Sequence, residues 1–275
     1  PISVGAILPL DIAVDRVRQA VEACRQHGVV LTARAEQLLY GSTDVDEVIL
    51  YRSPGVHAGV GGILRLAGEL REKKFDAAIL LQNAIEAAII SFLAGIPVRA
   101  GFNSDGRGPL LTHSVKRTRA VRRIHQVDYY LEMVKTLGCV DGSRELHLTL
   151  TRADQNRTDE ILRSYGIDPD AFLVGIAPGA TFGAAKKWFP DRFAAVAGRL
   201  TDEFSARVLL FGSAGDREST EGVARYARHT LTDLAGMTTL REAISLISRC
   251  RLFISNDSGL MHVAGALDVP TVAVF

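Results

Sequence analysis

The chain has 275 residues, of which 47% are hydrophobic, and a formal net charge of +1. This length suits one large or two medium globular domains, and the balanced charge gives no indication of a nucleic-acid-binding protein. No apolar run reaches the roughly 18 residues that a membrane-spanning helix needs. The three cysteines, Cys24, Cys139 and Cys250, lie far apart and lack the spacing of a metal or redox motif.

In the first half of the chain, apolar runs typical of buried strands alternate with stretches of helical periodicity. Leu66, Ala67 and Leu70, for example, recur at helical spacing. We expect strands at 29–33, 47–51, 76–82 and 96–102, and helices at 59–74, 84–95 and 125–138. Strands that alternate with helices in this way predict parallel sheets covered on both faces.

After about residue 150 the alternation starts again. Expected helices occupy 152–166, 190–204 and 241–250, with another after residue 258, and expected strands occupy 172–179, 206–213, 251–255 and 269–275. Two such series predict an α/β protein with two Rossmann-like halves. We place an N-terminal domain at 1–160 and a C-terminal domain at 161–275.

Both ends of the chain are unusual for this fold class. Residue 1 is a proline, with no initiator methionine, and the chain stops inside the strand-like run 269–275. A buried parallel strand is rarely the last element of such a fold. We therefore expect both ends to be truncated and the C-terminal domain to be incomplete.

Ligands of open parallel sheets bind at the carboxyl ends of the strands, so the loops that follow strands are the candidate sites. The first such loop, APGATFGAAKKW, contains Gly179, Thr181, Lys186 and Lys187. Glycine, hydroxyl and lysine after a strand suit a phosphate group, although the spacing is not that of a P-loop. An ordinary turn with solvated lysines is an equally good interpretation of this loop taken alone.

A second loop, FGSAGDRE, places Asp216 and Glu218 just past an expected strand. A carboxylate in this position can accept hydrogen bonds from ribose hydroxyls. Acidic residues are also favoured at the start of any helix by the helix dipole, and for this loop alone that interpretation is the stronger one.

The third loop, SNDSGLMH, lies between two apolar segments. Asp257 or Ser258 can cap the helix that follows, whose first N–H groups would form an anion site beside Gly259. Ser258 and His262 are four residues apart and share a helix face, so the histidine can donate to the same anion. A packed histidine is the common alternative, but here the shared turn favours a binding site.

The segment 104–125 concentrates basic residues in an otherwise balanced chain. Its cationic side chains are Arg107, Lys116, Arg117, Arg119, Arg122 and Arg123, together with two histidines. Such a concentration indicates an anionic partner, although a solvated basic loop is a common alternative. The motifs of dinucleotide cofactors, hydrolase triads and zinc sites are absent from the sequence, and we expect no metal.

Taken in order, these motifs resemble a known family. The segments LLQNAIEAAIISFLAGIPVRAGF, GRGPLL, APGATFGAAKKWFP, LFGSAGDRE, LAGMTTLREAISLISRC and SNDSGLMHVAGALDVPTVAVF are similar to the ADP-heptose:lipopolysaccharide heptosyltransferases of glycosyltransferase family 9, most of all to heptosyltransferase II. The resemblance extends from about residue 44 to the end of the chain. Any one motif alone would be weak, but the ordered set is specific.

The resemblance implies a GT-B architecture, with two Rossmann-like domains facing a cleft. It implies an inverting transfer of heptose from ADP-heptose to the inner core of lipopolysaccharide, without a metal or other cofactor. The nucleotide sugar would bind the C-terminal domain and the lipopolysaccharide acceptor the N-terminal domain. The enzyme would work in the cytoplasm, peripheral to the inner face of the inner membrane, with no nucleic-acid partner.

By motif position, the resemblance also assigns roles to residues. Lys186 and His262 are the expected catalytic groups, which would stabilise the charge of the leaving diphosphate. The expected donor-binding residues are Thr181, Lys186, Asp216, Met237, Asp257, Ser258, Gly259 and His262. The expected acceptor-binding residues are Asn83 and Arg107, to which the basic segment adds Arg119 and Arg122.

The sequence departs from the family at its expected general base. The family has a Gly-Asp pair in its first loop, whereas this chain has Gly5 followed by Ala6, which cannot accept a proton. The general base is therefore unknown and expected near Ala6. Two alternatives stay open: a GT-B transferase that uses another nucleotide sugar, and a catalytically impaired homologue that binds a nucleotide sugar.

Overall fold

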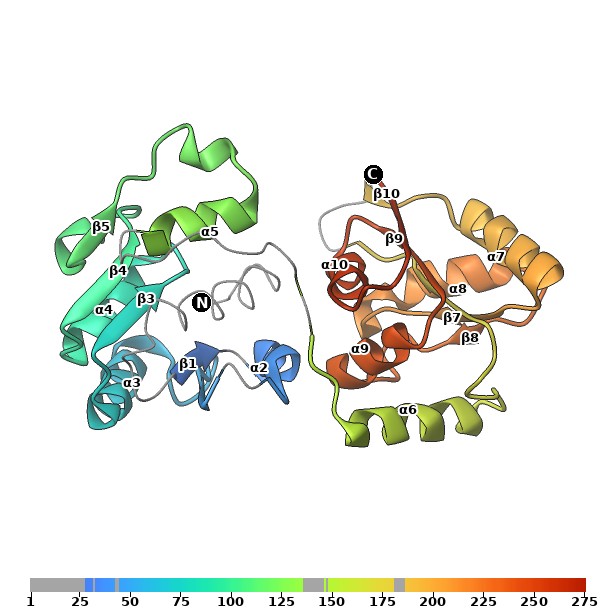
Figure 1. Ribbon diagram of the computed structural model, residues 1–275, viewed down its shortest axis with the longest axis horizontal. Helices are drawn as coiled ribbons and strands as arrows, with labels where there is room; N and C mark the ends of the chain where they lie inside the picture. The colour runs from blue at the N-terminus through green and yellow to red at the C-terminus, as the bar shows by residue number, and fades with distance from the viewer. Residues whose placement is uncertain (1–27, 32, 43–44, 136–145, 147, 181–185) are drawn as a thin grey trace. The chain divides into compact units, whose positions relative to one another are not determined.

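The computed structural model describes residues 28–31, 33–42, 45–135, 146, 148–180 and 186–275 (Figure 1). The chain divides into two compact units, Pro1–Glu145 and Leu146–Phe275. The domain boundary expected at residue 160 falls inside helix α6 (Arg152–Ser164), which belongs to the second unit. Among the described helices, none has the length and apolar character needed to cross a membrane.

The first unit contains two parallel sheets with helices beside them. Strand β1 (Gly28–Leu31) pairs with β2 (Glu47–Leu50), and β4 (Val98–Phe102) lies between β3 (Ala77–Leu80) and β5 (His113–Val115). The helices are α2 (Ala33–Leu39), α3 (Gly59–Lys73), α4 (Ile85–Leu93) and α5 (Gln126–Lys135), with short 3₁₀ turns η1 (Gly108–Leu110) and η2 (Val121–Arg123). Leu66 and Leu70 of α3 pack with Ile90 of α4 and with Tyr51 in one buried cluster.

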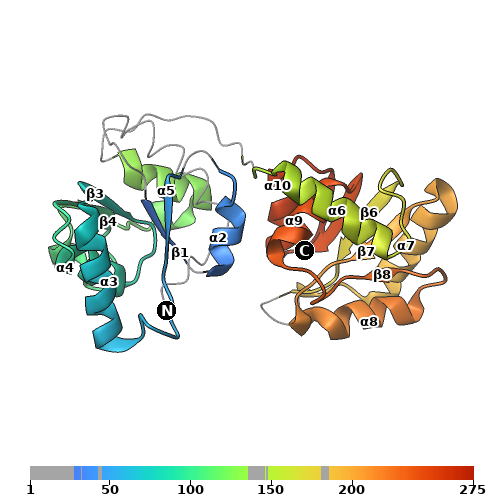
Figure 2. The same cartoon turned by 90° about the horizontal axis from the view of Figure 1, so that it is seen from below.

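The second unit is a single parallel sheet in the strand order β10-β9-β6-β7-β8. Its elements after α6 are β6 (Leu173–Ala177), α7 (Pro190–Phe204), β7 (Arg207–Leu210), η4 (Ala214–Asp216), α8 (Arg217–Tyr226), β8 (Thr232–Asp233), α9 (Leu240–Ser248), β9 (Leu252–Asn256), α10 (Gly259–Ala266) and β10 (Thr271–Val274). Helices α7 and α8 pack together, as do α6 and α9, and α9 and α10 (Figures 1 and 2). The predicted α/β class with parallel sheets is confirmed.

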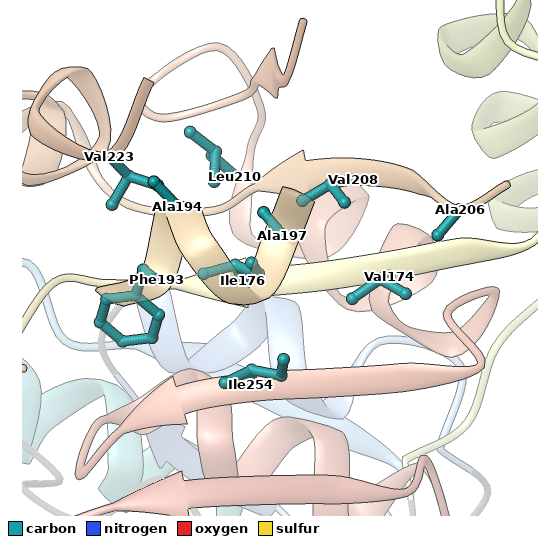
Figure 3. Close-up of a cluster of buried hydrophobic side chains, with 10 residues drawn as sticks. All are labelled: Val174, Ile176, Phe193, Ala194, Ala197, Ala206, Val208, Leu210, Val223 and Ile254. Carbon is teal, nitrogen blue, oxygen red and sulfur yellow. The ribbon is translucent and has the colours of Figure 1, made fainter. Parts of the chain in front are cut away.

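The core of the second unit explains why the apolar runs of the sequence became strands. All five residues of β6 are buried, as a central parallel strand requires. Val174 and Ile176 of this strand pack against Phe193 and Ala197 of α7, with Ile254 of β9 beside them (Figure 3). Burial of each large side chain stabilises the fold by about 1.5–3 kcal/mol relative to exposure.

The strand order of this sheet reverses at β6. The chain runs outward from β6 to β7 and β8, then returns to place β9 and β10 on the opposite side of β6. Such a reversal opens a crevice outside the carboxyl ends of the two strands at the switch point, which here are β6 and β9. The loops after β6 and β9 are two of the three loops that the sequence singled out.

Candidate functional site

A buried asparagine joins the two loops at the switch point. Asn256 ends β9, and its side chain is fully buried. Its Nδ2 donates to the carbonyl of Pro178 over 2.8 Å, and its Oδ1 accepts from the main-chain N–H of Trp188 over 3.0 Å. Both ends of the loop after β6 are therefore fixed to the end of β9. This role of Asn256 was not predicted, although a polar residue directly after an apolar strand is a signal for it.

We expect the substitution Asn256→Ala to lower the free energy of unfolding by about 2 kcal/mol, because the buried carbonyl of Pro178 and the partly buried N–H of Trp188 lose their partners. Trp188, the only tryptophan of the chain, reports on this loop in a urea titration followed by fluorescence. Ser219→Ala is the control, since within the described residues it removes only the hydroxyl that accepts from Lys187 Nζ. Equal stability of the two variants would contradict a joining role for Asn256.

Lys186 and Asp257, two expected donor-binding residues, form an ion pair at this point. The Lys186 Nζ lies 2.5 Å from Asp257 Oδ2, and both side chains are partly exposed. The hydrogen bond from Lys186 holds the pKa of the Asp257 carboxyl below its usual range, and the charge of His262 lowers it further. Two segments 71 residues apart in sequence thus bring a cation and a carboxylate to one position.

The start of α10 differs in detail from the expected side-chain cap. Ser258 stands at the N-cap, but its side chain makes no capping bond, and its Oγ instead lies 2.9 Å from Ser255 Oγ. Since Asp257 pairs with Lys186, neither expected residue acts as a cap in the described chain. Gly259 and His262, both exposed, follow on the first turn of the helix. The first N–H groups of α10 therefore have no cap from either side chain, which leaves the helix start suited to an anion.

Asp216 lies in the neighbouring loop after β7 and contacts the loop after β6. Its Oδ2 accepts from the main-chain N–H of Ser213 over 2.8 Å and from Ser213 Oγ over 2.7 Å, which forms a capping box. A Cβ added to Gly179 would lie 2.2 Å from Asp216 Oδ1, so only glycine allows this close approach. The helix-start interpretation of Asp216 therefore describes part of its role, and the carboxylate also borders the switch-point loops.

Met237 lies beside the same loop. It follows Gly236, whose φ of +66° brings the chain close to Ala214. The Met237 side chain is 60% exposed, and Arg217 Nη2 lies 3.3 Å from its Sδ. An exposed apolar side chain here offers a surface on which a planar ring can pack.

Two expected positions fall outside the described residues: Thr181, in the loop after β6, and Ala6, near which the general base was expected. Among the residues that the structure does describe, no group of three His, Cys, Asp or Glu side chains could hold a metal ion.

In the first unit, the structure brings Asn83 and Arg107 together. Asn83 Oδ1 lies 3.4 Å from Arg107 Nη2. The Arg107 side chain is fully buried, and its Nε donates to the carbonyl of Phe102 over 2.6 Å. Burial lowers the pKa of its guanidinium. As placed, Arg107 therefore holds the loops after β3 and β4 and presents no charge to solvent.

Arg119 and Arg122 lie apart from this pair, on an exposed basic segment. Both are solvent-exposed, as are Lys116, Arg117 and Arg123. No acidic residue occurs in the sequence between Asp105 and Asp128, so these exposed cations have no acidic neighbour within the segment. Such a segment attracts anionic groups.

The chain matches glycosyltransferase family 9 (heptosyltransferase) over residues 63–275. Lipopolysaccharide heptosyltransferase 2 of Salmonella typhimurium is 31% identical over 255 residues, which cover 90% of this chain and 73% of that protein.

Solved structures show the same likeness. ADP-heptose lps heptosyltransferase II of E. coli is 28% identical with a TM-score of 0.81, covering 99% of this chain and 83% of that one. The glycosyl transferase family 9 protein of Veillonella parvula, at 24% identity and a TM-score of 0.87, shares the fold over 97% of this chain and 77% of its own. The expected GT-B fold class is confirmed.

Proposed function

The chain belongs to glycosyltransferase family 9, the heptosyltransferases, and from this premise we propose that it transfers heptose from ADP-heptose to the inner core of lipopolysaccharide. An acceptor hydroxyl oxygen attacks the anomeric carbon of the heptose from the side opposite the diphosphate. The bond between that carbon and the diphosphate oxygen breaks, ADP leaves, and the configuration inverts. The hydroxyl proton passes to a general base.

The observation that carries this proposal is the convergence of Lys186, Asp257 and the start of α10 at the switch point of the second unit's sheet. Nucleotides bind parallel sheets at such points, and helix N-termini bind phosphates. Lys186 would exchange Asp257 for the diphosphate when the donor binds. Asp257 would then be free to accept hydrogen bonds from the sugar.

The same residues account for leaving-group departure. Negative charge grows on the diphosphate as its bond to the anomeric carbon breaks. Lys186, His262 and the N–H groups at Ser258 and Gly259 would stabilise that charge, and they do so best where they are already oriented.

The remaining donor contacts follow from the positions of the neighbouring loops. Asp216, whose carboxylate borders Gly179, would accept from the ribose hydroxyls. The exposed Met237 would pack on the adenine ring. Thr181 belongs to the same proposed set by its motif.

We assign the lipopolysaccharide acceptor to the first unit. Asn83, with Arg107 behind it, would contact the sugar core, and Arg119 and Arg122 would bind its anionic groups. The exposed basic segment 116–123 also suits contact with an anionic membrane surface. We therefore propose that the enzyme works in the cytoplasm, at the inner face of the inner membrane.

A transfer assay tests the proposal. The protein is incubated with ADP-heptose and one of two lipopolysaccharide acceptors, whose inner core carries either no heptose or one heptose. The mass of the acceptor is then measured by mass spectrometry. We expect the mass of one heptose to be added together with release of ADP. The acceptor that reacts identifies which heptose is transferred.

Nucleotide preference tests the donor separately. We expect calorimetry to give a dissociation constant for ADP at least about tenfold lower than for UDP or GDP, a difference of about 1.4 kcal/mol. Tighter binding of UDP or GDP would assign the chain another nucleotide sugar.

Ala6 favours a second candidate, a protein that binds the nucleotide sugar without turnover. In that case ADP binds but no heptose is transferred. Recovery of transfer by Ala6→Asp would support this candidate, and transfer by the unchanged protein would exclude it.

A further inference from the structure

The amide of Asn83 is held by two hydrogen-bond donors in the first unit. Its Oδ1 accepts from the hydroxyl of Tyr129 over 3.0 Å and lies 3.4 Å from Arg107 Nη2. Asn83 follows β3, Arg107 follows β4, and Tyr129 lies on α5. Three separate elements therefore meet at one side chain at the carboxyl edge of the sheet.

Arg107 determines which way the amide faces. A guanidinium can only donate hydrogen bonds, so the Asn83 atom beside it must be the oxygen. The NH2 group is therefore directed away from Arg107 and Tyr129. Within the described chain no hydrogen bond involves Asn83 Nδ2, which leaves its two N–H groups available to a ligand.

Main-chain carbonyl groups around Arg107 hold its guanidinium in place beside Asn83. Besides Asn83, its guanidinium donates to the carbonyls of Phe102, Gln82 and Leu80, and no carboxylate accepts from it among the described residues. A Cβ added to Gly101 would lie 3.1 Å from Arg107 Nη2, so glycine leaves room for the group. A buried cation that is hydrogen-bonded to Oδ1 draws electrons from the amide, which makes the NH2 a stronger donor.

We propose that Arg107 and Tyr129 are positioning residues that hold the NH2 of Asn83 toward the acceptor, where it donates to a hydroxyl or carboxylate oxygen of the sugar core. This inference rests on the proposed function, because it takes the acceptor to bind the first unit. In this proposal Arg107 does not contact the acceptor directly. It orients Asn83, and Asn83 makes the contact.

Tyr129→Phe is the most selective test. The ring of Tyr129 is buried and stacks on Phe102 with 4.2 Å between centroids, and phenylalanine keeps that packing while it removes the hydroxyl. We expect the KM for truncated lipopolysaccharide to rise about three- to tenfold, as the loss of one hydrogen bond predicts. The kcat and the KM for ADP-heptose should stay within about twofold, since neither the donor site nor the reacting atoms are touched.

Tyr130→Phe is the matched control, because it removes a hydroxyl from the next residue of the same helix. Tyr130 meets the Tyr129 ring edge-on at 5.3 Å, and its hydroxyl is not a partner of Asn83 in the described chain. We expect its acceptor KM to equal that of the unchanged protein. If the acceptor KM rises equally in Tyr129→Phe and Tyr130→Phe, the cause is a general disturbance of α5, and the proposal is overturned.

A double-mutant cycle separates positioning from simple loss of structure. Asn83→Ala should raise the acceptor KM, and adding Tyr129→Phe to it should raise KM no further, because the hydroxyl acts only through Asn83. A further rise in the double variant would overturn the proposal. If Asn83→Ala leaves the acceptor KM unchanged while transfer continues, Asn83 does not contact the acceptor and the inference is wrong. If the unchanged protein transfers no heptose, the proposed function itself is wrong.

Gly101→Ala is a second test of the proposal, and it keeps the side chains of Asn83, Arg107 and Tyr129. The added methyl group must displace Arg107 Nη2 or Leu80 by a few tenths of an ångström. We expect a rise in acceptor KM with the KM for ADP-heptose unchanged. A folded Gly101→Ala variant with unaltered acceptor KM would contradict the role of Arg107.

Discussion

Replacing Lys186 with alanine is expected to reduce kcat/KM for heptose transfer about 100-fold, the usual effect of removing one group that stabilises transition-state charge. The dissociation constant for ADP should rise about tenfold, because a charge-assisted contact with the diphosphate is lost. The expectation rests on the position of Lys186 Nζ, 2.5 Å from Oδ2 of Asp257, the residue before the N-cap of α10. Calorimetry with ADP and the transfer assay measure the two effects separately.

Lys187→Ala is the matched control for this experiment. The two lysines are adjacent, but Lys187 Nζ donates to Ser219 Oγ over 3.0 Å and points to a different partner. We expect its effect on ADP affinity to stay below about threefold, as for a single exposed contact. If both lysines have equal effects, bulk charge rather than a defined phosphate contact accounts for binding.

Breaking the ion pair between Arg241 and Asp154 is expected to have the largest effect on stability, about 3 kcal/mol for Arg241→Met. Arg241 Nη2 and Nε lie 2.6 Å and 2.9 Å from the two oxygens of Asp154, and the pair joins α9 to α6. The two side chains are only 12% and 9% exposed. Urea unfolding of the unchanged protein and of Arg241→Met at pH 7 measures this loss in the free energy of unfolding.

An exposed pair on α7 provides the control. Arg199 and Glu203 form an i, i+4 ion pair with both side chains well exposed. Arg199→Met should therefore change the free energy of unfolding by less than about 0.5 kcal/mol. Equal losses for Arg241→Met and Arg199→Met would show that burial of the α6–α9 pair contributes nothing.

The same pair predicts an acid dependence of stability. The hydrogen bond from Arg241 is the main cause that lowers the pKa of Asp154 from its ordinary 3.8 to about 2. Because the folded-state pKa is the lower one, the contribution is fully present above about pH 5 and is lost as the pH falls toward 2. About half of it should be lost by pH 3. The stability difference between the unchanged protein and Arg241→Met should narrow accordingly between pH 7 and pH 3, and a constant difference would contradict this assignment.

Most of the long elements of the fold were predictable from the sequence because they have strong repeating patterns. Helix α3 and strand β6 are examples, since helical spacing of apolar residues and an unbroken apolar run each have one favoured structure. Helices α2 and α8 were not among the expected elements, and neither were the short strands β5 and β8. The two strands have three and two residues and are bonded to neighbours through the main chain, which leaves no side-chain pattern to detect.

The candidate site was predictable in part. The three loops after strands were found because polar, glycine-containing segments there contrast with the apolar runs before them. The joining role of Asn256 was missed although its position at the end of an apolar strand is a signal. The role of Tyr129 was missed because a tyrosine that orients a distant amide has no local sequence pattern. Arg107 was found, but its burial was not expected, because an arginine in a basic segment is ordinarily solvated.

The sequence by itself therefore determined the α/β class, the order of the long elements and the family, because these depend on residue patterns along the chain. The tertiary structure decided which distant groups meet: Lys186 with Asp257, Asp216 with Gly179, and Asn83 with Arg107 and Tyr129. For Lys186 and Asp257 the physical reason is that strand order, not chain order, places the carboxyl ends of β6 and β9 beside each other. Hydrogen bonds between those ends depend on a register that no local pattern encodes.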